Sequence, residues 1–436
     1  MRATKDSGIE WIGQIPQEWE ISRVKYLYDV TLGKMLQPAP KSDDDELCSY
    51  MCAANINWSG VDLSVEKKMW FSAKDKESYR LAAGDLLVTE GGDVAVSCIW
   101  NDELPECYIQ NAVHRVRPKS DASNRYLYYW LSTIKATGYI DLVCNKATLA
   151  HFTKDKFDSC VIPVVSADEQ HTIANYLDAK CAEIDALIAA KEKTNALLKE
   201  RRQSIIYEAV TKGLNPDAPM KDSGIEWIGQ IPETSNIVRF KYLCDVFGRI
   251  GFRGYTQADI VADGEGPITL SPSNIEELGM SFSKCTYLTW DKYNESPEIQ
   301  VRVGDILLVK TGSSYGKSSI IDSLPMEATI NPQLVVIKNI RCNARYLYYC
   351  MQTDSFEYQV ERAVVGGTIP TMAQEKINNF IVVLPETGAC DEIVTYLDRE
   401  CLKINKMVAT NVETIQKLKE YRQSIIYEAV TGKIEV

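Results

Sequence analysis

The chain has 436 residues, of which 45% are hydrophobic and 25% are charged, and its 48 Lys and Arg against 60 Asp and Glu give a formal net charge of −12. This composition is typical of a soluble globular protein of roughly two to four domains. No apolar run approaches the roughly 20 residues that span a bilayer, and the opening MRATKDSGIEW lacks the apolar region of a signal peptide. We therefore expect a cytoplasmic protein without membrane contact, and the acidic balance taken alone argues against a nucleic-acid partner.

The thirteen Cys are scattered and form no C-x-x-C pair, and the only imidazoles are those of His114, His151 and His171. A zinc site would have to be assembled from distant positions. We therefore expect reduced Cys that lie mostly in the core, and no bound metal.

The sequence consists of two tandem copies. KDSGIEWIGQIP at 5–16 returns unchanged at 221–232, and RQSIIYEAVT at 202–211 returns unchanged at 422–431. Drift after a duplication would erode all exposed positions alike, so an unchanged polar peptide beside divergent stretches indicates one scaffold with two different recognition surfaces. The divergent stretches are 34–83 and 250–303.

In chain order, residues 20–165 are rich in short β-type runs, and RYLYYWL at 125–131 has the spacing of one short amphipathic helix. Residues 168–211 contain no Gly or Pro, and apolar residues recur there at the steps of a long helical seam. The second copy repeats this order, with a mixed region at 236–386 that includes RYLYYCM at 345–351, followed by a second long helix. The two seams contain Ile173, Leu177, Cys181, Ile184, Ile188, Leu198, Ile205 and Ala209, and Ile393, Leu397, Cys401, Ile404, Val408, Leu418, Ile425 and Ala429.

Each long helix would be on the order of 60 Å long and cannot bury its apolar stripe alone. Lys191 and Asn411, then Arg202 and Arg422, interrupt the seams at matching positions, which is typical of residues that set register and partner choice. The simplest solution pairs the helices in an antiparallel coiled coil. Two separate hairpin-like extensions, each packed on its own domain, are the alternative.

The predicted fold is therefore α+β, with two mixed α/β domains that alternate with two long helices in a pseudo-twofold internal repeat. The predicted boundaries are 1–166 for the first domain, 167–213 for the central helix, 214–388 for a linker and the second domain, and 389–436 for the C-terminal helix.

No catalytic constellation emerges from the sequence. GSSYGKS at 312–318 follows a strand-like run, but it has three residues between its glycines where a phosphate-binding loop needs four. NPQL at 331–334 lacks the second Pro and the aromatic residue of the amino-methyltransferase loop. The His have no metal or triad spacing, and no Gly-rich cofactor fingerprint follows an early strand. We predict a non-catalytic chain without a cofactor of its own.

Two polar sets in each copy suit recognition of phosphates and base edges, because small, hydroxyl and amide side chains can approach both. One set follows each GD(L/I)L strand, and the other precedes each terminal strand; for any single residue a solvated loop is the alternative. The candidate DNA-binding residues are Thr89, Gly91, Asp93, Asn145, Lys146, Thr148 and His151, and Lys310, Thr311, Ser313, Ser314, Tyr315, Lys317, Gly367, Thr368 and Thr371.

The matching helix ends favour helix pairing or contact with two identical partners, and simple closure of the helix ends is the alternative. The candidate residues are Leu177, Arg202, Tyr207, Leu397, Arg422 and Tyr427.

With these features together, the chain resembles the specificity subunits of type I restriction–modification enzymes over essentially its whole length. One departure is that Pro385–Asp398 lacks the Glu-Gln pair of Pro163–Asp178 and carries Asp391-Glu392 and a two-residue deletion instead. The resemblance is carried by KDSGIEWIGQIP, GDLLVTEGG, GDILLVKTGSSYGK, the Pro163–Asp178 run, KERRQSIIYEAVTKG and KEYRQSIIYEAVTGK.

The resemblance implies that each mixed domain is a target recognition domain that reads one half of a bipartite, asymmetric double-stranded DNA site. It implies two modification subunits as partners, which carry S-adenosylmethionine and methylate adenine, and restriction subunits that translocate and cut DNA with ATP and Mg²⁺. The acidic total then predicts weak DNA binding by the chain alone, with most phosphates neutralised by partners. The alternatives are a methyltransferase-only or phase-variable related system, or a coiled-coil adaptor without a DNA role.

Overall fold

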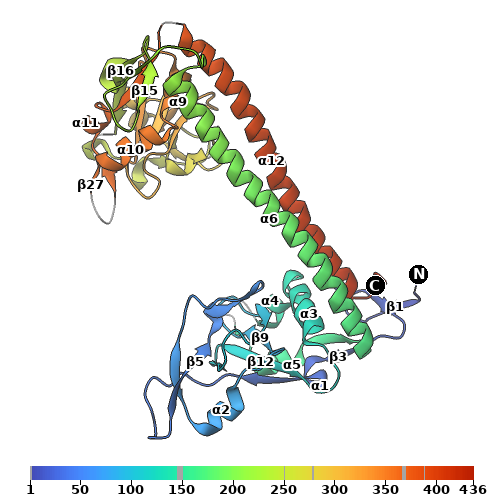
Figure 1. Cartoon of the computed structure of the whole chain (residues 1–436). Coiled ribbons are helices and arrows are strands. Elements are labelled where there is room, and N and C mark those ends of the chain that lie inside the picture. Colours follow the sequence, from blue (N-terminus) through green and yellow to red (C-terminus); the bar gives the residue numbers. More distant parts are fainter. Residues whose placement is uncertain (1, 145–150, 250, 277–278, 366–369, 387) are drawn as a thin grey trace. The chain divides into compact units, whose positions relative to one another are not determined.

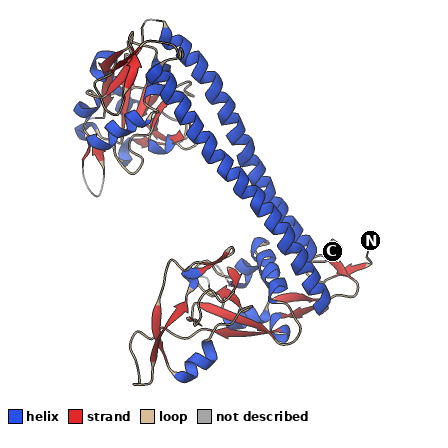
Figure 2. Ribbon diagram, in the orientation of Figure 1, coloured by secondary structure: helices blue, strands red, loops and turns tan. Residues whose placement is uncertain are grey.

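The computed structural model describes residues 2–144, 151–249, 251–276, 279–365, 370–386 and 388–436, which gather into two compact units (Figure 1). The first unit contains residues 1–191 and 413–436, and the second contains residues 192–412. Each unit therefore combines the globular part of one copy with a helix segment of the other copy. Each mixes strands with short helices, as predicted (Figure 2).

The first unit is built around a four-stranded antiparallel sheet in the order β10 (Ser97–Ile99), β9 (Leu86–Thr89), β12 (Val113–Pro118) and β4 (Tyr28–Leu32). A second sheet has the order β11 (Tyr108–Ile109), β5 (Glu46–Met51) and β8 (Lys68–Phe71), with β11 parallel to β5. Short pairs join β1 (Thr4–Asp6) to β2 (Gln14–Pro16), β3 (Glu20–Arg23) to β13 (Val161–Val164), and β6 (Ile56–Asn57) to β7 (Gly60–Val61). The short helices are α1 (Val24–Leu27), α2 (Ala73–Tyr79), α3 (Asn124–Ala136), α4 (Tyr139–Cys144) and α5 (Lys154–Ser159).

The second unit has a four-stranded sheet of the same order, with β24 (Ser318–Ile320), β23 (Ile306–Val309), β26 (Leu334–Lys338) and β17 (Asp245–Gly248). Its other sheet has the order β18 (Ile260–Val261), β22 (Thr286–Leu288), β19 (Ile268–Leu270) and β25 (Ala328–Ile330). Short pairs join β14 (Met220–Asp222) to β15 (Gln230–Pro232), β16 (Asn236–Arg239) to β29 (Ile381–Leu384), β20 (Ile275–Glu276) to β21 (Gly279–Met280), and β27 (Val364–Val365) to β28 (Thr371–Met372). The short helices are α7 (Phe240–Leu243), α8 (Trp290–Asn294), α9 (Ala344–Cys350), α10 (Asp354–Ala363) and α11 (Gln374–Ile377).

The two GD(L/I)L runs form the innermost strands. All four side chains of β9 and all four of β23 are buried. Such continuous apolar runs are expected for strands that are covered on both faces. The short amphipathic helices predicted at 125–131 and 345–351 are confirmed as parts of α3 and α9.

Two long helices, α6 (Ala167–Lys212) and α12 (Ala389–Val430), carry the predicted seams. In the first unit, Leu177 and Ile184 of α6 share one core with Ile425 of α12. In the second unit, Ile206 of α6 shares a core with Leu397 of α12. The sequence pattern placed Ile205 in the buried seam, but Ile205 is only partly buried and its neighbour Ile206 is fully buried.

The predicted two-residue deletion before α12 is wrong. Strand β13 pairs Val161 with Arg23, and β29 pairs Ile381 with Arg239, so the offset of 220 residues already holds at these strands. It still holds at Asp178 and Asp398, which accept hydrogen bonds from equivalent tyrosines. The apparent deletion arose from aligning Pro163 with Pro385, which occupy different positions in the two copies.

Cysteine burial follows the prediction. All thirteen Cys are free thiols, and ten of them are buried. Among the described residues, no helix is both long and apolar enough to cross a membrane.

Candidate nucleic-acid interface

The first candidate edge consists of the loop after β9 and the segment that begins at His151. The Phe152 amide donates a hydrogen bond to the Glu90 carbonyl oxygen at 2.8 Å. The His151 ring lies 3.8 Å from the position that a Cβ on Gly91 would take. The structure thus brings members of both predicted polar sets together, while the remaining candidates of this copy lie outside the described residues: Asn145, Lys146 and Thr148.

Thr89 shapes this loop from within. It is buried, and its hydroxyl donates to the Asp93 carbonyl oxygen at 2.6 Å and accepts from the Val96 amide at 3.0 Å. The Asp93 carboxylate is exposed and forms an ion pair with Lys135 at 2.5 Å. The exposed side chains of Asp93 and His151 therefore remain on the outer surface of the edge.

His114 of β12 holds the same edge from the core. Its ring is fully buried beside Phe152 and Phe157, and Nε2 lies 2.7 Å from the Phe152 carbonyl oxygen. Because burial disfavours the charged form, the pKa of His114 falls to about 4. The imidazole is therefore neutral near pH 7, with Nε2 as the donor to Phe152.

The second candidate edge is the turn between β23 and β24, which lies against Thr371. The hydroxyls of Thr311 and Thr371 are 2.9 Å apart, and the Gly312 amide donates to the Pro370 carbonyl oxygen at 3.1 Å. A strand, not a helix, follows this turn, so GSSYGK lacks the helix N-terminus of a phosphate-binding loop. The other two candidates, Gly367 and Thr368, lie outside the described residues.

The side chains of the second edge differ in exposure. Ser313 and Lys317 are exposed, whereas Ser314 and Tyr315 are half-buried, and Tyr315 packs on the core of this unit. Lys310 is half-buried, and burial lowers its pKa. A partly desolvated ammonium is well suited to bind a phosphate oxygen or a base acceptor, because its own hydration has already been reduced.

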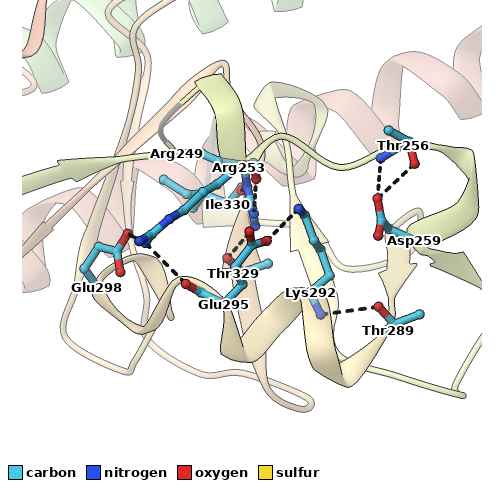
Figure 3. A network of polar contacts seen from close by, with 10 residues as sticks. All are labelled: Arg249, Arg253, Thr256, Asp259, Thr289, Lys292, Glu295, Glu298, Thr329 and Ile330. Atoms are coloured by element: carbon cyan, nitrogen blue, oxygen red, sulfur yellow. Dashed lines mark hydrogen bonds and ion pairs between the residues drawn. The ribbon is translucent and has the colours of Figure 1, made fainter.

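A buried arginine that the sequence analysis missed organises the second divergent stretch (Figure 3). Arg249, directly after β17, donates to the Ile330 carbonyl oxygen at 3.0 Å, to the Thr329 hydroxyl at 3.0 Å and to the Arg253 carbonyl oxygen at 3.2 Å. Arg253 in turn donates to the Glu295 carbonyl oxygen at 3.3 Å. The only sequence signal was an Arg at the point where similarity between the copies ends.

A buried cation also begins the first divergent stretch. Lys34 forms an ion pair with Asp75 and lies 5.2 Å from the centre of the Phe71 ring. Gly33 before it allows a close passage, because the Gln110 carbonyl oxygen lies 2.4 Å from the position of a Cβ there. A buried cation therefore follows the edge strand of the common sheet in each unit, β4 in the first and β17 in the second, and its partners differ between the two copies.

The helix-end tyrosines bind the unchanged peptide within each unit. The Tyr427 hydroxyl donates to the carbonyl oxygens of Trp11 at 3.0 Å and Ile12 at 3.2 Å. The Tyr207 hydroxyl donates to the carbonyl oxygen of Ile228 at 3.2 Å. Ile228 and Ile12 occupy the same position of the repeated peptide, so both tyrosines hold this peptide in the same way.

The other helix candidates also have defined surroundings. Leu177 and Leu397 are fully buried in the cores of the two units. Arg422 forms an ion pair with Asp185 at 3.0 Å in the first unit. Arg202 is half-buried in the second unit and lines a cavity of about 300 Å³.

Arg249→Met should lower the free energy of unfolding by roughly 2–4 kcal/mol, because the buried Ile330 carbonyl and Thr329 hydroxyl lose their donor. Chemical denaturation of the full chain measures this loss. Arg302→Met is the matched control at an exposed position, and it should change stability by less than about 0.5 kcal/mol. Equal effects of the two substitutions would contradict a structural role for the Arg249 network.

Acidification should destabilise the first unit through His114. The folded-state pKa of about 4 lies below the unfolded value of roughly 6.5, so the unfolded chain binds more protons between these values. The stability that neutral His114 contributes is complete above about pH 6.5 and is lost as the pH falls toward 4, by roughly 3 kcal/mol in total.

Chemical denaturation of wild type and His114→Gln at several pH values tests this sign. The stability advantage of wild type should shrink as the pH falls, whereas His171→Gln, at an exposed position of α6, should give no such trend. A constant difference between wild type and His114→Gln would contradict a lowered pKa.

The chain is similar in sequence to proteins that contain DNA specificity domains. Residues 16–199 match the family model of the type I restriction modification DNA specificity domain. The type I restriction enzyme MjaVIII specificity subunit of Methanocaldococcus jannaschii is 21% identical over 429 residues, which cover 97% of this chain and 94% of that protein. The StySPI specificity subunit of Salmonella potsdam is 26% identical over 223 residues, which cover 49% of this chain and 47% of that protein.

Two solved structures share the fold. A chain solved in work on complex assembly and conformational transition of the type I R-M system has a TM-score of 0.72 at 15% identity, covering 96% of this chain and 99% of that chain. The HsdS subunit from Thermoanaerobacter tengcongensis has a TM-score of 0.51 at 15% identity, covering 96% of this chain and 98% of that chain. Residues 16–199 thus match the type I restriction modification DNA specificity domain, and the chain is similar over its full length to specificity subunits of type I restriction enzymes.

Proposed function

We propose that the chain reads a bipartite, asymmetric DNA site, with one edge of each unit contacting one half-site. The observation that carries this proposal is a common four-stranded sheet in both units, to which different polar edges and different divergent stretches are attached. The first edge presents Asp93 and His151, whereas the second presents Ser313, Lys317 and Thr371. Different donors and acceptors in the major groove select different base pairs, so the two half-sites have different sequences.

Mapping of modified adenines across the host genome, with and without this gene, tests the proposal. We expect one motif with two unlike halves and a fixed spacer to lose its methylation when the gene is deleted. Exchange of residues 34–83 for the corresponding stretch of a related chain should change only one half of the motif. A palindromic motif, or methylation that is independent of the gene, would refute the proposal.

In this proposal α6 and α12 pair as an antiparallel coiled coil that sets the distance between the half-sites. Two contacts support the pairing: Asp185 with Arg422 at 3.0 Å in the first unit, and Asn195 with Asn411 at 2.8 Å in the second. Residue numbers rise along one helix as they fall along the other. A polar pair within a seam is typical of a contact that fixes register.

Lengthening both helices tests this ruler. Four residues inserted after Lys191 and four after Val412 would add about 6 Å, which corresponds to roughly one to two base pairs of spacer. We expect the methylated motif to keep both halves and to lengthen its spacer. Four residues inserted in the 214–219 linker are the control and should leave the spacer unchanged; the helices are not the ruler if the first variant also leaves it unchanged.

Two modification subunits are the proposed protein partners, and restriction subunits join through them. S-adenosylmethionine, ATP and Mg²⁺ belong to these partners, and the chain itself performs no catalysis. The repeated peptide KDSGIEWIGQIP supports two like partners, because contacts within each unit do not account for the identity of its exposed residues. Glu10 and Glu226, at the same position of the two peptides, are exposed carboxylates in both units, and identical exposed groups suit identical partner surfaces.

A further inference from the structure

At one place in the first unit, four side chains fill a space beside the end of α12. Trp19 is only 1% exposed, and its Nε1 donates to the Glu169 carboxylate at 3.1 Å. Arg2 forms ion pairs with both Glu18 and Glu169, and its guanidinium lies 6.0 Å from the Trp19 ring centre. The indole reaches the last turn of the chain, where the position of a Cβ on Gly432 is 3.1 Å from it. We call these four side chains, Arg2, Glu18, Trp19 and Glu169, the plug.

The second unit lacks the whole plug. Strand pairing is conserved around it, because β1 pairs Thr4 with Pro16 and β14 pairs Met220 with Pro232, which fixes the offset of 216 residues on this side. The offset on the α6 and α12 side is 220 residues, as the β13 and β29 registers show. The plug positions are therefore occupied in the second unit by Ala218, Thr234, Ser235 and Ala389.

The space that these short side chains leave is an open pocket. It has a volume of about 510 Å³, and all four substituted positions line it, together with the end of α6 and the start of α12. This volume falls within the range of roughly 300–1,000 Å³ that is typical of ligand pockets. Loss of the Trp alone would have left the Glu169 carboxylate without its indole donor beside a cavity. Loss of all four side chains also removes that carboxylate and its Arg2 partner.

The rim of the pocket is acidic where the first unit is neutral. Glu233, Glu386 and Glu392 line the pocket and are exposed, and they outnumber the one exposed cation of the lining, Lys212. The equivalent residues of the first unit are uncharged: Gln17, Ser166, Thr172 and Gly432. An occupant with a positive charge beside an apolar group would therefore gain Coulomb energy at the rim.

We propose that this pocket is a docking site for an aromatic side chain that is flanked by a cationic residue on a partner protein, and that this partner binds once per chain. The first unit supplies the chemical argument, because an indole and a guanidinium fill the same space there. It also supplies the stoichiometry, because the plug closes the equivalent position. This inference does not depend on how the edges read DNA.

Tryptamine, which joins an indole to an ammonium group, is the probe for the pocket chemistry. Calorimetric titration of the full chain should find one site per chain with a Kd of about 1 mM, as expected for an anchor of this size. Indole-3-propionate, which has a negative charge in place of the positive one, should bind at least about fivefold more weakly. Absence of saturable tryptamine binding would overturn the proposal, and a Kd below about 1 µM would replace the partner side chain with a small-molecule ligand.

Two variants locate the site. Ser235→Trp restores the indole and should abolish tryptamine binding. Glu392→Lys lies at the exposed rim, leaves the core untouched, and should reverse the preference toward indole-3-propionate. Thr172→Lys, the same change at the equivalent exposed position of the first unit, should have no effect. Tryptamine binding that survives Ser235→Trp, or a preference that Glu392→Lys does not move, would contradict the assignment.

The partner is tested in the assembled complex. The tagged full chain, purified from its host and weighed by native mass spectrometry, should lose one copy of one protein component in Ser235→Trp. Wild type and Thr172→Lys should retain that copy. An unchanged subunit composition in Ser235→Trp would overturn the docking role.

Discussion

The structure depends on one constraint: a long helix with a single apolar stripe has to bury that stripe against something else. Each mixed domain supplies part of the cover and closes on the end of the helix from the other copy. Tyr126 donates to the Val430 carbonyl oxygen at 3.1 Å, and Tyr346 donates to the Val210 carbonyl oxygen at 3.1 Å. Because each unit needs residues from both copies, neither copy completes its core alone.

This packing of each helix end on the domain of the other copy explains why some parts of the repeat stay identical while others diverge. The unchanged peptide is tied to a helix end by Tyr427 in one unit and by Tyr207 in the other. The divergent stretches have no such shared anchor. The first begins at Lys34 and the second directly after Arg249, and these two cations make different contacts in the two units. The shared sheet can therefore carry two different recognition surfaces, because each divergent stretch makes its own local contacts.

Local patterns predicted the tandem copies, the buried strands, the short helices and the long helices, because periodicity and exact repetition are written in neighbouring residues. What the sequence could not supply depends on contacts through space. Thr89 is a residue type that often contacts DNA, but its hydroxyl is hydrogen-bonded within its own loop. The sequence around Arg249 did not indicate that this side chain would be buried and hydrogen-bonded to Ile330. The misplaced deletion near Pro385 has the same cause, because only strand pairing fixed the register there.

The net charge of −12 acquires a more specific meaning from the structure. Lys34 and Lys135 are paired with carboxylates, and Arg249 is bound to backbone oxygen, so these cations stabilise the recognition units and are not free for phosphates. Lys317 is exposed at the second edge and keeps its charge available. The salt dependence of DNA binding scales with the number of phosphates neutralised. Because Lys34, Lys135 and Arg249 are held within the units, they cannot release counterions from DNA, and we expect part of the counterion release that drives tight binding to come from partner subunits.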